Sequence, residues 1–171
     1  VKKNVISYIN YPIRIYYIGR LDKDSEGLLL LTNQGELVNK MMRSGNQHEK
    51  EYVVTVNKPV TKEFIKKMQD GVPILGTKTR KCRVIQTGEK SFRIILTQGL
   101  NRQIRRMCQY LGYEVKRLKR IRVMNIELGD LPVGSYREVT AQEMKTLQEI
   151  IKDSSETTVI KKERGKKCEP D

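Results

Sequence analysis

An arginine and an aspartate stand one residue apart at the end of an apolar run, and this pair is the first candidate for chemistry. Arg20 and Asp22 follow 16–18, which reads Tyr-Tyr-Ile, and precede the leucines of 28–31. Turn residues close the leucine run, so we expect a buried strand there. An acid between two buried strands is shielded from solvent, as catalytic carboxylates often are. The alternative is a structural role, in which Asp22 caps a turn or pairs with Arg20.

A second candidate is an expected helix that carries three arginines near its start. We expect Asn101 to cap this helix and Gly112 to end it. One face is apolar, because hydrophobic residues recur there at helical spacing; they are Ile104, Met107, Cys108 and Leu111. The arginines are Arg102, Arg105 and Arg106. Arginines on a helix usually form a solvated face, so the helix by itself does not establish a site.

Further positive charge follows this helix, in a segment at 113–128 that we expect to be extended and basic. The stretch 102–122 contains a single acid, Glu114. Its basic residues are Arg102, Arg105, Arg106, Lys116, Arg117, Lys119, Arg120 and Arg122. Alternate side chains of a strand face opposite sides, so some of these charges must line one surface together. That surface is either a solvated strand face or a groove that follows the phosphates of a nucleic acid.

Three motifs, in order, resemble the RsuA-type ribosomal RNA pseudouridine synthase family. The three motifs are Gly19–Asp22 continued by Gly27–Asn33, then Lys50–Tyr52, then Asn101–Met107. The segment that follows the third motif, Gly112–Val115 with Leu118 and Arg120, resembles the family as well. The likeness runs from about Asn4 to Ile151. Residues 45–52 are most similar to the bacterial members that act on the large-subunit RNA. Each motif is common by itself, whereas three in the family's order form a specific pattern.

The resemblance implies an isomerase that flips a uridine of ribosomal RNA, from the large subunit, and converts it to pseudouridine. It implies that Asp22 is the essential carboxylate, which either attacks the nucleoside or abstracts a sugar proton. Tyr52 would stack on the target base and accept the C5 proton. Arg105 would pair with Asp22 and orient it, because a guanidinium fork matches a carboxylate. No cofactor and no metal are implied.

The remaining roles concern RNA contacts and the walls of the pocket. Arg20 would occupy the space left by the flipped uridine and return part of the cost of unstacking. We expect Arg102 and Arg106 to point toward RNA or solvent, because neighbouring helix positions cannot both face one pocket. The full set of expected RNA-binding residues is Arg20, Arg102, Arg106, Lys116, Arg117, Lys119 and Arg120. Ile104 and Leu118 would form apolar walls; on any other interpretation they are core residues.

Composition supports a polyanionic partner. The chain has 171 residues and a formal net charge of +14, from 34 basic and 20 acidic side chains. Such an excess favours RNA. We expect no membrane partner, because no apolar run approaches the roughly 18 residues of a spanning helix. One histidine, His48, and three scattered cysteines offer no zinc site, and no nucleotide-binding motif is present. We expect a cytoplasmic monomer with reduced cysteines.

Element patterning predicts an α+β fold with a mixed, mostly antiparallel sheet and flanking helices. We expect helices at 4–10, 36–44 and 62–70, and a last helix after Thr140. Expected strands are 14–18, 27–32, 51–57, a hairpin of 79–86 and 91–97, and 135–139. Residues 1–152 would form the catalytic domain, without the first strand and the S4-like RNA-binding domain usual in the family. Residues 153–171 would be a flexible basic tail.

Two other functions are compatible with parts of the pattern. A non-catalytic RNA-binding module would use the basic surface alone, and Asp22 would then be structural. The joint presence of Asp22, Tyr52 and Arg105 argues against it, because a binder needs no such acid. A DNA-binding domain would call for a helix-turn-helix or a similar reading element, and none is evident.

Overall fold

A six-stranded mixed sheet organises the protein in the computed structural model, which describes residues 4–43 and 47–152. Five of its strands are ordered β10-β9-β4-β8-β7, and β2 pairs with β9. All pairs are antiparallel except β2 with β9. The strands are β2 (Glu26–Gly27), β4 (Lys50–Val56), β7 (Arg83–Gly88), β8 (Ser91–Leu96), β9 (Val115–Val123) and β10 (Ile126–Glu127). The predicted α+β class with a mostly antiparallel sheet is confirmed.

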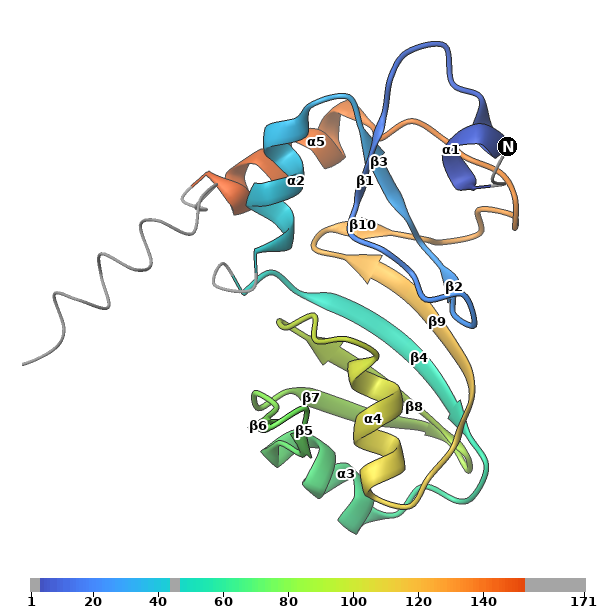
Figure 1. The fold of residues 1–171 in the computed structure, drawn as a ribbon, viewed down its shortest axis with the longest axis vertical. Helices are drawn as coiled ribbons and strands as arrows, with labels where there is room; N and C mark the ends of the chain where they lie inside the picture. Colours follow the sequence, from blue (N-terminus) through green and yellow to red (C-terminus); the bar gives the residue numbers. More distant parts are fainter. Residues whose placement is uncertain (1–3, 44–46, 153–171) are drawn as a thin grey trace, which may run out of the picture.

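Helices lie at both ends of the sheet (Figure 1). They are α1 (Val5–Ile9), α2 (Gly35–Met42), α3 (Lys62–Asp70), α4 (Gln103–Tyr110) and α5 (Ala141–Ile151). The helix ends follow local signals. The hydroxyl of Thr61 accepts a hydrogen bond from the Phe64 amide, and Thr140 forms a capping box with Glu143. Side-chain oxygens of this kind satisfy first-turn amides, which makes these starts predictable from sequence.

Two hydrophobic cores result. The larger one lies between the sheet and α3 and α4, and its most buried members include Val54, Met68, Phe92, Ile94 and Met107. The smaller one joins α2 and α5 to β9 and β10, through residues such as Leu37, Met41, Val123, Ile126 and Leu147. The β1–β3 pair (Tyr16–Ile18 and Leu30–Thr32) belongs to this second core. The loop of Asp22 leaves β1 and returns through β2, which pairs with β9.

The sequence predicts one buried strand over the leucine run, and this prediction is wrong. Gly27 ends β2, and the chain then changes partner, so that Leu30 begins β3 beside β1. Leu28 and Leu30 are buried, whereas the two leucines at 29 and 31 are only half-buried. The physical reason is a change of sheet partner, which local hydrophobicity does not encode.

Two further segments differ from the prediction. Residues 73–78 form an unpredicted hairpin of β5 (Pro73–Ile74) and β6 (Thr77–Lys78), and the following strand, β7, begins only at Arg83. The strand expected at 135–139 is absent from this described stretch. Instead, the Tyr11 hydroxyl donates to the Glu138 side chain in this stretch, and the Tyr8 hydroxyl donates to the Gly134 carbonyl just before it. The predicted tail at 153–171 lies outside the described residues.

Candidate active site

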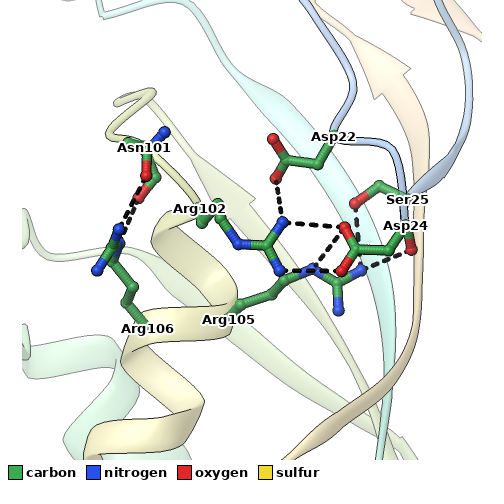
Figure 2. Close-up of polar contacts among 7 residues, drawn as sticks. All are labelled: Asp22, Asp24, Ser25, Asn101, Arg102, Arg105 and Arg106. Carbon is green, nitrogen blue, oxygen red and sulfur yellow. Dashed lines mark hydrogen bonds and ion pairs between the residues drawn. The ribbon is translucent and has the colours of Figure 1, made fainter.

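Residues 19–25 form the loop that carries Asp22, between β1 and β2. Gly19 begins the loop at φ +76°, in the left-handed region that favours glycine. The Ser25 amide donates to the Asp22 carbonyl oxygen at 2.9 Å, which closes a tight turn. The Asp22 side chain is 39% exposed. The prediction that this acid is shielded from solvent is therefore wrong, because the loop lies beyond the strands, next to the start of α4 (Figure 2).

Two arginines at the start of α4 hold this loop through Asp24 (Figure 2). Arg102 donates to both carboxylate oxygens of Asp24, at 3.0 and 2.9 Å. Arg105 donates from Nη2 to the Asp24 backbone oxygen at 2.7 Å, and its Nε lies 3.5 Å from Asp24 Oδ1. The hydrogen bonds from Arg102 lower the pKa of Asp24 to about 2. The loop and the helix are thus joined by a charged fork at neutral pH.

The partner of Asp22 differs from the prediction. Arg105 was expected to pair with it, but the nearest guanidinium is that of Arg102, whose Nη1 lies 3.8 Å from Asp22 Oδ2. Arg102 was expected to face RNA or solvent and instead reaches both acids of the loop. Its backbone has φ 48° and ψ 40°, just before the first helical residue. A left-handed residue directs its side chain away from the helical faces, so helical periodicity does not describe it.

Sequence reasoning missed Asp24, the acid of this loop that both arginines contact. It stands two residues after Asp22 in the same loop. A second acid so close to a candidate catalytic acid, in a chain rich in arginine, was an available signal. What the sequence could not show is that both arginines reach Asp24, because that depends on how α4 is packed beside β9.

Arg106 turns back onto the residue that was expected to cap the helix. Its Nε and Nη2 donate to the backbone and side-chain oxygens of Asn101, each at 2.9 Å. The prediction that Asn101 is the N-cap is wrong, because Arg102 occupies the cap position and no side chain caps the helix. The Gly112 stop is confirmed, at φ +82° just after α4.

Arg120 is buried rather than displayed on the basic surface. Its side chain lies on the core face of β9, opposite Tyr52 of β4, and the residue is 2% exposed. Its Nε donates to the Leu28 carbonyl at 2.8 Å, and its Nη1 to the Arg20 carbonyl at 3.4 Å. Arg120 therefore does not belong to the exposed basic surface with the other predicted RNA-binding residues, which corrects that prediction. Its guanidinium instead holds both ends of the loop that contains Asp22.

The loop also approaches β9 through its backbone. Gly27 has φ +113°, and a Cβ there would lie 2.1 Å from the Arg120 carbonyl oxygen. No larger residue fits that approach without a shift of the backbone. The Leu28 amide donates to the same Arg120 oxygen at 2.8 Å. Position 120 therefore fixes the loop through both its side chain and its main chain.

Tyr52 is half-buried and packs against the main core. Its strand neighbours are Arg120 on one side and Ile94 on the other. Ile104 and Leu118, the expected pocket walls, are both buried in that same core. Tyr52 therefore stands between a packed apolar interior and the arginine that holds the loop of Asp22.

The basic segment in β9 is divided between the interior and the surface. Lys116 and Arg117 are exposed, and Lys119 is half-exposed. Lys116 pairs with Glu114 at 3.4 Å, and Arg117 forms an ion pair with Glu26. Exposed pairs of this kind contribute little and are readily replaced by another anion. Arg20 is likewise exposed. These side chains remain candidates for phosphate contacts.

Other kinds of site find little support in the described residues. No cluster of three or more His, Cys, Asp or Glu side chains suited to a metal occurs in the described ranges. Cys82 and Cys108 are free thiols, and burial raises their pKa to about 11 and about 12; Cys168 lies outside the described residues. No helix in the described part of the chain is both long and apolar enough to cross a bilayer.

The arrangement can present a carboxylate to a bound polyanion. Asp22 is accessible and is flanked by a guanidinium that does not fully engage it. The loop around it is fixed from two directions, by α4 through Asp24 and by β9 through Arg120. A rigid loop with an open acid beside positive charge suits chemistry on a nucleic acid better than simple binding, which needs no acid.

The sequence model of a family described as RNA pseudouridylate synthase matches residues 2–110. Two relatives agree with that match. The dual-specificity RNA pseudouridine synthase RluF of Escherichia coli (strain K12) is 55% identical over 154 residues, which cover 90% of this chain and 53% of the relative. The ribosomal large subunit pseudouridine synthase B of Bacillus subtilis (strain 168) is 39% identical over 145 residues, or 81% of this chain and 59% of that one.

A solved structure has the same fold. The crystal structure of a pseudouridylate synthase superposes with a TM-score of 0.80 at 27% identity, over 84% of this chain and 64% of that one. The chain spans about half the length of RluF, 53%. The likeness in sequence and the likeness in fold point to the same family.

Proposed function

The chain belongs to the RNA pseudouridylate synthase family, and on that premise we propose that it converts a uridine of ribosomal RNA to pseudouridine. This reaction breaks the N1–C1′ bond, rotates the uracil and rejoins it through C5; the proton lost from C5 is balanced by one taken up at N1. Substrate and product have the same atoms, so the reaction needs neither an oxidant nor a group donor. The observation that carries the proposal is Asp22, an accessible acid on a loop that two arginines and a buried guanidinium hold in place.

Asp22 is the essential carboxylate of this proposal, as nucleophile or as base toward a sugar proton. Arg102 and Arg105 act through Asp24 and position the loop, so that Asp22 meets the nucleoside in one orientation. Tyr52 stacks on the uracil and accepts the C5 proton, and its place beside Arg120 supports this role. Ile104 and Leu118 supply the apolar wall behind it.

RNA contacts extend the proposal to the surface. Arg20 fills the space left by the flipped uridine, and Lys116, Arg117 and Lys119 contact phosphates. Arg106 contributes at the start of α4 once RNA competes for its bonds to Asn101. We propose the large-subunit RNA as the substrate, supported by the name of the Bacillus relative. The catalytic domain is 1–152, and the protein acts as a monomer in this scheme.

Substitution of Asp22 tests the catalytic role. Asp22→Asn keeps the shape of the side chain and removes the charge, so isomerisation should stop, whereas RNA affinity should change by no more than about twofold. Pseudouridines should be mapped in ribosomal RNA from cells that lack the gene and carry either the wild-type or the variant copy. Asp70→Asn, at the exposed end of α3, is the matched control and should restore the modification.

The outcomes separate the two functions. The catalytic function is supported if one pseudouridine is lost when the gene is deleted, returns with the wild-type copy and does not return with the Asp22→Asn copy. Turnover by the Asn variant would remove Asp22 from the mechanism. RNA binding by the wild type with no pseudouridine anywhere would favour the non-catalytic RNA-binding module.

A further inference from the structure

Two buried cations meet on the face of the sheet that packs against α4. Lys50, at the start of β4, is 7% exposed, and Arg120 of β9 is 2% exposed. Lys50 precedes Tyr52 by two residues in the same strand, and Tyr52 is the register partner of Arg120. Alternate residues of a strand share a face, so all three side chains lie on the core side. Buried lysine and arginine are rare unless an anion compensates them.

Among residues 4–43 and 47–152, no acid forms an ion pair with Lys50 or Arg120. Within the described part of the chain, the Lys50 ammonium has neither a hydrogen-bond acceptor nor an acidic partner. Burial, and then the charge of Arg120, lower the pKa of Lys50. The adjacent buried acid, Glu51, faces the other side of the sheet, where it pairs with Arg93 and Arg122. The charge of Lys50 and Arg120 is therefore not neutralised locally.

Arg120 also has a donor to spare. Two of its nitrogens serve the loop carbonyls of Leu28 and Arg20, but Nη2 is buried without any hydrogen-bond partner. Leaving a buried guanidinium donor without an acceptor costs stability. A bound anion is one way in which such a group is completed. The free donor and the free ammonium belong to the same pair.

The pair borders both halves of the candidate active site. Lys50 Nζ lies 3.9 Å from the position that a Cβ on Gly99 would take, in the turn that leads into α4. Arg120 contacts the backbone of Arg20, two residues before Asp22. An anion between the cations would therefore lie between the loop of Asp22 and the turn before Arg102. A group in that position is next to whatever Asp22 acts on.

We propose that Lys50 and Arg120 form an anion subsite that binds one backbone phosphate of the RNA next to the uridine presented to Asp22. The inference rests on the proposed function. A phosphate oxygen can accept from the ammonium and from Arg120 Nη2 together, and its charge neutralises part of the pair. A uracil carbonyl would satisfy one donor but would leave two buried positive charges. This phosphate contact differs from those of the exposed lysines, because the phosphate would neutralise buried positive charge that no described acid of the protein neutralises.

The first test replaces the ammonium and keeps the length of the side chain. Lys50→Met should leave the protein as stable as wild type or more so, because a buried uncompensated charge is removed. Its affinity for RNA should fall about tenfold, the scale of one charged hydrogen bond. Lys66→Met, the same change at an exposed position of α3, is the control and should alter neither quantity. A less stable Lys50→Met protein with unchanged RNA affinity would show that Lys50 serves the fold, and would overturn the subsite.

The second test locates the phosphate. A 23S rRNA stem-loop that the protein binds is prepared with one neutral methylphosphonate at a time around the target uridine, and affinity is measured for wild type and Lys50→Met. One linkage should cost wild type about tenfold and should cost Lys50→Met clearly less, because the variant has already lost the contact between the ammonium and that phosphate and keeps only the one from Arg120. Additive losses at every linkage would overturn the subsite.

Pseudouridine formation by the wild type on the unmodified stem-loop is read separately. A protein that isomerises uridine but shows no coupling to any phosphate would contradict the subsite alone. Absence of isomerisation on ribosomal RNA would contradict the proposed function, and the subsite with it.

Discussion

Asp24 engages both arginines that approach the loop, which leaves the Asp22 carboxylate with one long contact among the described residues. Arg102 and Arg105 make four contacts to Asp24 of 3.5 Å or less, whereas Asp22 lies 3.8 Å from Arg102. A carboxylate held bidentately by arginine is a poor nucleophile or base, because its lone pairs are occupied. The loop thus uses one acid to fix its position and leaves the other accessible.

The charge state of Asp24 offers a direct test of this division. Its pKa is lowered from 3.8 to about 2, chiefly by the hydrogen bonds from Arg102. A lowered pKa in the folded state means that the stabilisation is fully present above about pH 3.8 and is lost as the pH falls through about 2. In Arg102→Gln, the Asp24 carboxyl should titrate near its ordinary value, as followed by the carboxyl carbon in an NMR titration.

Arg106→Gln provides the control for that titration. Arg106 bonds Asn101 and does not contact Asp24, so the titration of Asp24 should stay near pH 2. An Asp24 midpoint that is the same in wild type and Arg102→Gln would show that Arg102 does not hold this acid in solution.

For individual residues, the sequence predicted which loop and which helix carry the site, but not which arginine of the helix contacts which acid of the loop. The order of the motifs indicated Asp22, Tyr52 and Arg105, because each of them stands at a fixed position in a motif of the family. It could not predict that Arg102 reaches farther than Arg105, since that follows from a left-handed backbone at Arg102. Nor could it predict that Arg120 is buried, because its burial depends on the loop that folds over β9.

Strand β2 positions the loop of Asp22, although it is only two residues long. Its parallel contact with β9 brings Gly27 against the backbone of Arg120. The Arg120 side chain then reaches over the loop to the carbonyls of Leu28 and Arg20. The element is short, but it joins the two ends of the loop to the central part of the sheet.

Gly27→Ala should separate β2 from β9. The new Cβ would lie 2.1 Å from the Arg120 oxygen on a backbone at φ +113°, so strain and clash together should cost about 2–4 kcal/mol. Calorimetry should show the lowered melting temperature. Hydrogen exchange should show lost protection of the Leu28 amide, which donates to that same oxygen.

Gly76→Ala separates the two causes. Gly76 has φ +73° but no atom within 4 Å of an added Cβ, so it tests the backbone strain without the clash, about 1 kcal/mol. If the Leu28 amide stays protected in Gly27→Ala, β9 accommodates the new Cβ by a small shift, and Gly27 does not fix the loop.

The helices were more predictable than the strands for a physical reason. Thr61 and Thr140 satisfy amides three residues away, so the sequence contains the whole interaction. The strand expected at 135–139 and the single strand expected over the leucine run depended on partners far along the chain. At the first segment, Tyr11 donates to Glu138 and Tyr8 donates to Gly134 just before it, and no strand pairs with it among the described residues. In the second, β9 and β1 each take part of the run.

Positive charge serves two different purposes across the whole molecule. Arginines on both faces of the sheet are used internally: Arg120 holds the loop, and Arg122 pairs with Glu49 and Glu51. The exposed charge of β9 is then reduced to Lys116, Arg117 and Lys119. The net charge of +14 therefore overstates how many cations are available to RNA from this strand.

Lys116 and Lys119, on the exposed side of β9, should contact RNA phosphates rather than bases. No aromatic residue stands between Lys116 and Arg122 to stack a base, and phosphate contacts carry no sequence information directly. Lys116→Gln with Lys119→Gln should weaken the binding of target and non-target RNA alike. For single-stranded contacts, the slope of log affinity against log salt should flatten by about 0.7 for each lost contact. Binding titrations at several salt concentrations measure both effects.

Lys62→Gln with Lys66→Gln, on the exposed side of α3, makes the same change in net charge and should leave the slope close to that of wild type. The rate of the chemical step at saturating RNA should hardly change in the β9 double variant, because these lysines lie outside the loop of Asp22. Weaker target binding with unchanged non-target binding would contradict the electrostatic role. It would mean that this end of β9 reads bases, and that the only phosphate contact with a structural consequence is the one proposed at Lys50 and Arg120.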